Sequence, residues 1–176
     1  AWRTGPVRRP SLPRPGRAGY RDPPLRGDTV HSDPSRTLIE RTEAYEVVGG
    51  EADARVVIVC EHASAGLPTG WTWPHGDERL LGTHWSYDIG AADVTRAFAQ
   101  AFNAPAILGA YSRLLIDLNR GADDPTLVMK LSDGAIIPGN AKADANEIRT
   151  RIATYYRPYH DAIEAQIARA KAAGVQ

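Results

Sequence analysis

The 176-residue chain, of which 43% is hydrophobic, is long enough for one domain with a real core. Its formal net charge is zero, but the charge is unevenly spread. Residues 1–36 contain eight arginines, no lysine and three aspartates, whereas residues 37–176 contain 13 basic and 18 acidic residues. The larger part is therefore mildly acidic, which argues against a nucleic-acid partner. No apolar run approaches the ~18 residues of a membrane span, which argues against a membrane partner.

The first 36 residues have the composition of a disordered extension. They hold seven of the 13 prolines and show almost no apolar periodicity. Such a segment cannot bury enough surface to offset its ordering entropy. Its arginines also suit a basic tail that binds a partner, or a targeting peptide, although the prolines forbid the amphipathic helix of a targeting peptide. We expect residues 37–176 to form the folded domain. One cysteine excludes an intrachain disulfide and fits a cytoplasmic protein.

Residues 44–48 and 55–60 have the pattern of strands. The four consecutive β-branched residues 56–59 suit a strand that is buried on both faces, as in a parallel sheet. This run ends at Glu61 and His62. In open α/β sheets, ligands bind just beyond the carboxyl ends of the strands. Glu61 and His62 are therefore the first candidate site residues.

The rest of the chain alternates between helical and extended patterns, which predicts a layered α/β/α sandwich around a mostly parallel sheet. Val94, Phe98, Ala101 and Phe102 share one helical face. Pro158 lies inside the last helical stretch and should kink it. In chain order, we expect a helix over 87–102, strands over 106–108 and 114–120, a loop over 121–141 and a helix over 143–173.

His84 and Asp88 join His62 as candidate metal ligands. Histidine and aspartate are common ligands of zinc, and His84 and Asp88 share one face if a helix has begun at that point. The alternative is structural: Asp88 caps the helix, and His84 is a hydrogen-bonded loop residue. Spacing alone leaves both interpretations open.

A second cluster, near residue 120, suits the binding of a substrate carboxylate. Arg120 can form two parallel hydrogen bonds with a carboxylate, and the amide of Asn119 can add another. Arg113 is a further cationic candidate. In the alternative interpretation, Arg120 forms a structural salt bridge with Asp123 or Asp124.

Cysteine and histidine often act in catalysis, but Cys60 and His160 are both expected to have structural roles. Cys60 ends an apolar strand and is expected to be an inert core residue rather than a nucleophile. His160 lies in the long helix, where a packed or exposed histidine is commoner than a metal ligand. The neighbouring tyrosines 155, 156 and 159 are expected to belong to the core.

Five motifs that occur in order resemble those of the N-formylglutamate amidohydrolase family, whose fold is similar to that of zinc carboxypeptidases. The resemblance covers about residues 40–173. Its motifs are Cys-Glu-His-Ala-Ser at 60–64, His84 with Tyr-Asp-Ile-Gly-Ala at 87–91, Ser-Arg-Leu-Leu-Ile-Asp-Leu-Asn-Arg at 112–120, Ser-Asp-Gly at 132–134 with Ile-Pro-Gly-Asn at 137–140, and Arg-Pro-Tyr-His at 157–160.

The resemblance implies a zinc-dependent hydrolase that converts N-formyl-L-glutamate, or a related N-acyl amino acid, into formate and glutamate. It implies that His62 is the first metal histidine. Residues 117–120 look like the carboxypeptidase Asp-x-Asn-Arg segment, which holds the substrate carboxylate. Glu61 is the candidate acid–base group because it is adjacent to the site.

The resemblance also implies a carboxypeptidase-like domain that is partial. Family members continue past the long helix into a strand with a His-Ser-Phe-Thr-like motif, whose histidine completes the metal site. This sequence stops at Gln176 without that motif. The alternative function is therefore a non-catalytic fragment or binding module that keeps a pocket for an acidic ligand.

Overall fold

The computed structural model describes residues 39–42, 44–71, 80, 82–132 and 134–175. The extension expected over residues 1–36 lies outside this range. The elements, in chain order, are β1 (Ile39–Arg41), β2 (Tyr45–Val48), β3 (Ile58–Cys60), α1 (Ala91–Phe102), β4 (Ala106–Gly109), β5 (Leu131–Ser132), β6 (Ala135–Ile136), α2 (Pro138–Ala141), α3 (Ala145–Arg151), the π-helix Ile152–Tyr156 and α4 (Arg157–Ala172).

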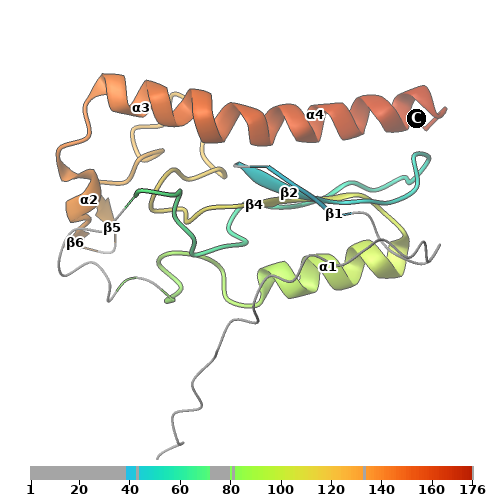
Figure 1. Cartoon of the computed structure of the whole chain (residues 1–176), viewed down its shortest axis with the longest axis horizontal. Coiled ribbons are helices and arrows are strands. Elements are labelled where there is room, and N and C mark those ends of the chain that lie inside the picture. The colour runs from blue at the N-terminus through green and yellow to red at the C-terminus, as the bar shows by residue number, and fades with distance from the viewer. Residues whose placement is uncertain (1–38, 43, 72–79, 81, 133, 176) are drawn as a thin grey trace, which may run out of the picture. The chain divides into compact units, whose positions relative to one another are not determined.

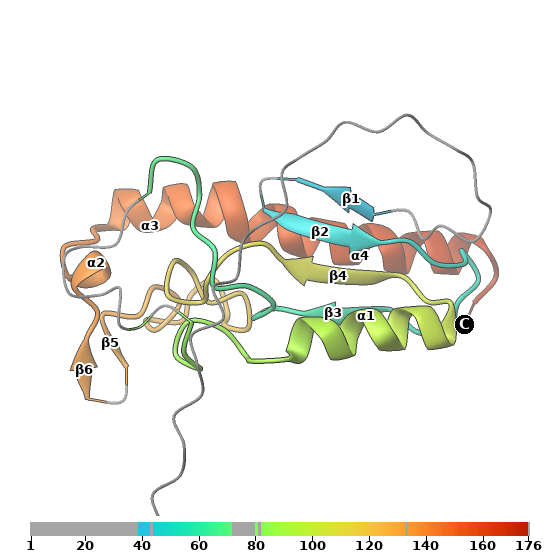
Figure 2. The ribbon, with the colours of Figure 1, turned by 60° about the horizontal axis from the view of Figure 1, so that its bottom comes forward.

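The main sheet is mixed and lies between two helical layers. Its strand order is β1-β2-β4-β3 (Figure 2). Only the pair β3–β4 is parallel, while β1–β2 and β2–β4 are antiparallel. The expectation of a mostly parallel sheet is therefore wrong for the described residues. The expectation of helices on both faces is confirmed, because α4 runs along one face and α1 along the other (Figure 1).

β4 is the strand that is buried on both faces. Ile107 belongs to the core cluster that contains Tyr159 of α4, while Ala106 and Leu108 belong to the cluster that contains Ala99 of α1. This alternation follows from the two-residue period of a strand. β3, for which we expected this position, pairs with β4 along one edge only, and Val59 is 38% exposed.

α1 begins four residues later than the sequence pattern predicts. Gly90, with φ 83°, adopts a left-handed conformation immediately before the helix. This conformation is incompatible with a helix that is already under way, and residues 84–86 form a turn that is followed by a bend at residue 87. His84 and Asp88 therefore do not share a helical face.

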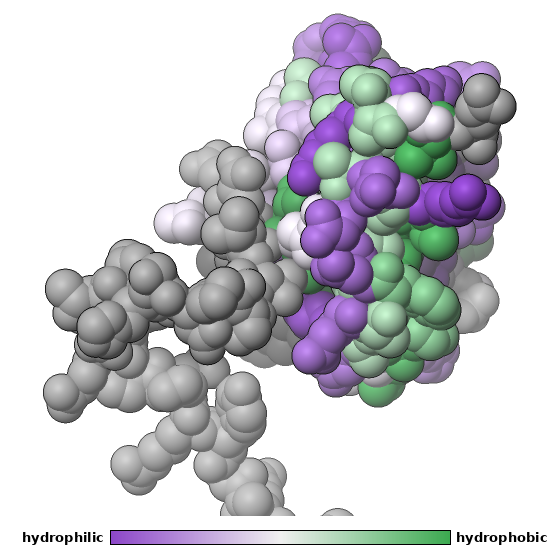
Figure 3. Space-filling view, turned by 90° about the vertical axis from the view of Figure 1, so that its right-hand side faces the viewer, coloured by the Kyte–Doolittle hydropathy of each residue, from purple (hydrophilic) through white to green (hydrophobic). Residues whose placement is uncertain are grey.

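The apolar face of α1 points away from the sheet. The buried residues of this helix are Thr95 and Ala99. Val94 is 53% exposed, Phe98 52% and Phe102 63%. Figure 3 shows apolar surface on the lower part of the view, the side on which α1 lies in Figure 1.

The strand expected over residues 114–120 is wrong, because this stretch forms buried turns. Residues 114–118 are at most 5% exposed, which explains why their sequence resembles that of a core strand. Side chains satisfy their carbonyl groups instead of a neighbouring strand. The amide of Asn140 donates to the carbonyl oxygens of Leu114 (2.7 Å) and Met129 (2.8 Å), and Arg151 donates to that of Leu115 (2.7 Å).

The expected loop over 121–141 contains short elements of its own. β5 and β6 form an antiparallel hairpin, and α2 follows with Pro138 in its first turn. Proline is favoured there because the first helical N–H groups have no partner within the helix. α2 places the side chain of Asn140 in the core, at 1% exposure.

The long C-terminal helix is continuous but contains a π-helical turn before Pro158. Within this turn, the N–H of Arg157 donates to the carbonyl oxygen of Ile152, five residues earlier. Pro158 has no N–H and cannot continue the α-helical ladder, and a π turn is a recognised way to absorb such a mismatch. No helix in the described part of the chain is both long and apolar enough to cross a membrane.

The exposure of α1 predicts how its two faces respond to substitution. Phe98→Gln should change the free energy of unfolding by less than about 0.5 kcal/mol, because the side chain is half exposed. Ala99→Leu, one residue along, should cost about 1–3 kcal/mol, because Ala99 is 2% exposed against the sheet and a larger side chain overpacks it. Urea unfolding of both variants checks this. Equal losses would contradict the observed orientation of α1.

Candidate functional site

His62 lies between two carboxylates just beyond the end of β3. Its side chain is 7% exposed. Its Nε2 lies 2.7 Å from Oδ1 of Asp117, and its Nδ1 lies 3.4 Å from Oδ2 of Asp88. Asp117 is fully buried, whereas the side chain of Asp88 is 56% exposed. One ring nitrogen of His62 thus faces the core and the other faces the surface.

Backbone contacts bring these residues together from three separate segments. The N–H of Asp88 donates to the carbonyl oxygen of His62 at 3.0 Å. The carbonyl oxygen of Ser86 accepts from the hydroxyl of Ser112 (2.8 Å) and from the N–H of Arg113 (3.1 Å). The turn before α1 is therefore fixed both to the end of β3 and to the buried turns that begin at residue 112.

Asp117 is the most highly connected carboxylate of the site. Besides His62, it accepts a hydrogen bond from the N–H of Asn119 (3.0 Å) and one from the guanidinium of Arg113 (3.1 Å). Nε of Arg120 lies 3.7 Å away. Burial alone would raise the pKa of Asp117, but the hydrogen bond and charge of His62, the Asn119 amide and Arg113 outweigh it and lower this pKa.

Arg113 joins the two carboxylates that flank His62. Its guanidinium contacts Asp117 and also lies 3.6 Å from Oδ1 of Asp88, with 23% of the side chain exposed. The charged groups at this edge are thus two carboxylates, Asp88 and Asp117, and two guanidinium groups, Arg113 and the more exposed Arg120. The site edge therefore presents cationic groups that are already oriented by Asp117.

Asn119 and Arg120 are exposed at the rim of the site. Arg120 forms its ion pair with Asp117, and no ion pair joins it to Asp123 or Asp124 in the described residues. This weighs against the interpretation of Arg120 as the partner of those two aspartates. Both side chains remain available to a ligand.

Among the described residues, no side-chain hydrogen bond or ion pair joins His84 or Glu61 to His62, whose partners are Asp88 and Asp117. His84 is exposed. Its ring packs edge-to-face against that of Trp85, with the ring centroids 6.2 Å apart. Glu61 is half-buried, and no hydrogen bond or ion pair between described residues joins it to the other candidates. Among the described residues, no group of three or more His, Cys, Asp or Glu side chains is close enough to hold a metal ion.

Gly109, at the end of β4, permits close packing beneath the site. A Cβ atom on Gly109 would lie 2.4 Å from the carbonyl oxygen of Glu61 and 2.7 Å from Cδ1 of Leu118. Only glycine fits this approach without a shift of the backbone. It lets the end of β3 and the segment around Leu118 lie against β4.

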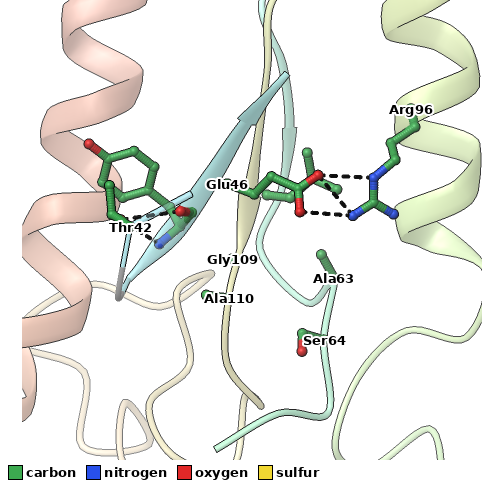
Figure 4. A pocket seen from close by; sticks show the side chains of 9 residues that line it. Thr42, Glu46, Ala63, Ser64, Arg96, Gly109 and Ala110 are labelled. Carbon is green, nitrogen blue, oxygen red and sulfur yellow. Dashed lines mark hydrogen bonds and ion pairs between the residues drawn. The ribbon is translucent and has the colours of Figure 1, made fainter. Parts of the chain in front are cut away.

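A cavity of about 220 Å³ opens beside the strand ends. Glu46 and Arg96 point toward one another on one side of it, in a bidentate pair with distances of 3.0–3.2 Å (Figure 4). Its lining residues are Thr42, Tyr45, Glu46, Ala63, Ser64, Arg96, Leu108, Gly109 and Ala110.

Cys60 is an inert core residue, as the sequence predicts. Its side chain is 7% exposed, and burial raises the pKa of its thiol. A thiol whose pKa is raised supplies less thiolate, which is the nucleophilic form.

The chain matches the family model described as N-formylglutamate amidohydrolase over residues 54–176. It belongs to the N-formylglutamate amidohydrolase family. This confirms the resemblance that the five motifs indicate. The family is generally metal-dependent. No curated protein sequence matches this chain.

Solved structures that are similar to this chain include the following two. A gene product from Agrobacterium tumefaciens is 33% identical, with a TM-score of 0.65, and the match covers 76% of this chain and 53% of that protein. N-formylglutamate amidohydrolase from Ralstonia eutropha JMP134 is 23% identical, with a TM-score of 0.56, and the match covers 73% and 52% of the two chains. The latter likeness concerns the fold alone. This chain spans about half the length of both.

Sequence analysis missed the central role of Asp117. Asp117 follows an apolar run and lies within the expected strand over residues 114–120, close to Asn119 and Arg120. The available signal was an acidic residue among residues that are otherwise apolar, since a buried carboxylate requires a charged or hydrogen-bonding partner. The identity of that partner, 55 residues earlier in the chain, has no local signature.

We predict that Asp117→Asn destabilises the fold in a pH-dependent way. Loss of one partner in a buried ion pair costs about 3–5 kcal/mol, so the loss at pH 7 should approach this range. Because the pKa of Asp117 is lowered in the folded state, its contribution is present above the ordinary aspartate pKa and disappears as the pH falls through the folded-state value. The difference between the variant and the unsubstituted chain should therefore shrink in acid.

Urea unfolding at pH 7 and near pH 3 measures this effect. Asp161→Asn, which alters an exposed carboxylate on α4, is the matched control and should change little at either pH. A pH-independent loss in Asp117→Asn would contradict the assignment of a charged, stabilising Asp117.

Proposed function

We propose that this chain carries part of the active site of a metal-dependent hydrolase that converts N-formyl-L-glutamate, or a related N-acyl amino acid, into formate and glutamate. The observation that carries the proposal is the position of His62, between Asp117 and Asp88 at the carboxyl end of β3. Family membership supports the reaction class.

His62 and Asp88 are suited to hold zinc. In metal-binding histidines, the N–H of the second ring nitrogen commonly donates a hydrogen bond to a carboxylate, which fixes the tautomer and the ring orientation. Asp117 occupies that position on Nε2, so Nδ1 is the nitrogen directed toward Asp88. Zinc takes three or four protein ligands, so the remaining ones would lie outside this pair. His84 stays a candidate on sequence grounds. Zinc, when bound, polarises a carbonyl and lowers the pKa of a bound water toward ~7.

Asn119, Arg120 and Arg113 would orient the substrate. A glutamate carboxylate at the rim can accept two hydrogen bonds from Arg120 and one from the amide of Asn119. Arg113, held by the two carboxylates that flank His62, can direct a hydrogen bond to the same ligand. Such binding places the formyl amide at a fixed distance from His62, which lowers the entropic cost of the reaction.

Amide hydrolysis also needs a group that moves a proton. Water attacks the formyl carbon, the C–N bond breaks, and a carboxylate transfers the proton of the water to the leaving amine. Glu61 is our candidate for this carboxylate because it directly precedes His62 in the chain.

A binding module is the alternative function. The absence of a three-residue metal cluster among the described residues favours it, while the exposed Asn119 and Arg120 would still bind an acidic ligand. This module would bind N-formyl-L-glutamate without releasing formate.

Zinc content and formate release distinguish the two functions. We expect the chain, supplied with zinc, to release formate from N-formyl-L-glutamate, and His62→Ala to abolish both zinc binding and formate release. His84→Ala is the matched comparison. If this variant no longer binds zinc, His84 is a ligand. Circular dichroism checks that each variant is folded. Binding of N-formyl-L-glutamate with no formate release would favour the module.

Arg120→Lys tests the binding of the substrate carboxylate. Lysine keeps the charge but cannot reproduce the planar pair of hydrogen bonds. Loss of one charge-assisted hydrogen bond, about 1.5–3 kcal/mol, should weaken binding about ten- to hundredfold. Arg120 is 45% exposed, so the melting temperature should hardly change. Calorimetric titration with N-formyl-L-glutamate, together with thermal unfolding, measures both. Unchanged affinity with a lower melting temperature would assign Arg120 a structural role.

A further inference from the structure

Two side chains of the C-terminal helix contact the backbone on either side of the Asn119–Arg120 pair. The hydroxyl of Tyr156 donates to the carbonyl oxygen of Arg120 at 2.7 Å. Nε2 of His160 lies 3.2 Å from the carbonyl oxygen of Leu118. A carbonyl oxygen can only accept, so Nε2 carries the proton in this contact. The peptide group before Asn119 is held from α4, and the one after Arg120 is held from the π-helical turn that precedes it.

The π-helical turn and its junction with α4 give these two donors their register. Tyr156 is the last residue of the π turn, and His160 follows four residues later. Residues four apart lie on the same side of a helix, and the two rings are 4.2 Å apart. The ring of Tyr155 instead packs against that of Tyr111, with the ring centroids 5.3 Å apart. π turns of this kind occur frequently at functional sites.

The opposite side of the same segment is held by Asp117. Its carboxylate accepts from the N–H of Asn119, and its carbonyl oxygen accepts from the N–H of Arg120 at 3.2 Å. The side chains of Asn119 and Arg120 are exposed, so packing does little to orient them. The direction in which they project therefore depends on the backbone that Asp117, Tyr156 and His160 hold and, for Arg120, on its ion pair with Asp117.

We propose that Tyr156 and His160 are positioning residues for the binding of the substrate carboxylate by Asn119 and Arg120. This inference rests on the proposed function. Neither residue touches the ligand. They restrict the peptide groups that bracket Asn119 and Arg120, so the two side chains meet a carboxylate without a further entropic cost of ordering the backbone.

Tyr156→Phe and His160→Phe remove the two donors and keep the aromatic packing. Each should weaken N-formyl-L-glutamate binding about three- to tenfold, the range expected for one neutral hydrogen bond. In an active enzyme, this loss should appear in KM with kcat unchanged. Amide hydrogen exchange at residues 119–121 should become faster in both variants without ligand. Tyr159→Phe, which removes a buried hydroxyl from the same helix, should alter neither binding nor this exchange.

A double variant separates positioning from general stability. If Tyr156 acts through Arg120, Tyr156→Phe should weaken binding much less in an Arg120→Lys background than alone. Equal effects in both backgrounds, or a lower melting temperature with unchanged affinity, would overturn the proposal.

The outcomes also separate this inference from the proposed function. If Arg120→Lys weakens binding and Tyr156→Phe does not, the positioning role fails while the proposed function stands. If the unsubstituted chain does not bind N-formyl-L-glutamate, the proposed function fails, and the exchange of residues 119–121 decides the positioning role. Unchanged exchange in both phenylalanine variants would then overturn it.

Discussion

The fully buried carboxylate of Asp117 is the group on which the site depends. It contacts His62 from the end of β3, Arg113 and Arg120 from its own segment, and the backbone of Asn119. A buried charge is tolerated only when such partners compensate for the loss of water. The same contacts orient the candidate metal histidine and the candidate substrate-binding segment, so stability and function are coupled at this residue.

The segment that carries Asp117 is held in place by side chains rather than by a sheet. Arg151, at 1% exposure, donates to the carbonyl oxygen of Leu115 and to Oδ1 of Asn140, pairs with Glu147, and places its guanidinium 4.5 Å from the centre of the Trp71 ring. These contacts replace the ladder of hydrogen bonds that a strand would have provided. The helices after the site, α2 to α4, therefore support the segment as well as cover it.

The described structure leaves apolar surface exposed at α1 and at the edge strand β3. The outer face of α1, Val56 just before β3 and Val59 within β3 are substantially exposed. The chain corresponds to about half the length of the two similar structures. Within the described residues, the candidate site comprises the exposed Asn119 and Arg120 at its rim, the His62–Asp117 pair and one further carboxylate, Asp88.

The sequence by itself determined the family, the strands expected over 44–48 and 106–108, which the structure has at 45–48 and 106–109, and the helix that ends at Phe102. These features depend on local periodicity and on short motifs, which a single sequence displays. Only the tertiary structure decided that residues 114–118 are buried turns, because a buried run is apolar whether its carbonyl groups meet a strand or the side chains of Asn140 and Arg151. It also decided which carboxylate faces each nitrogen of His62, because those partners lie 26 and 55 residues away and no local pattern relates them.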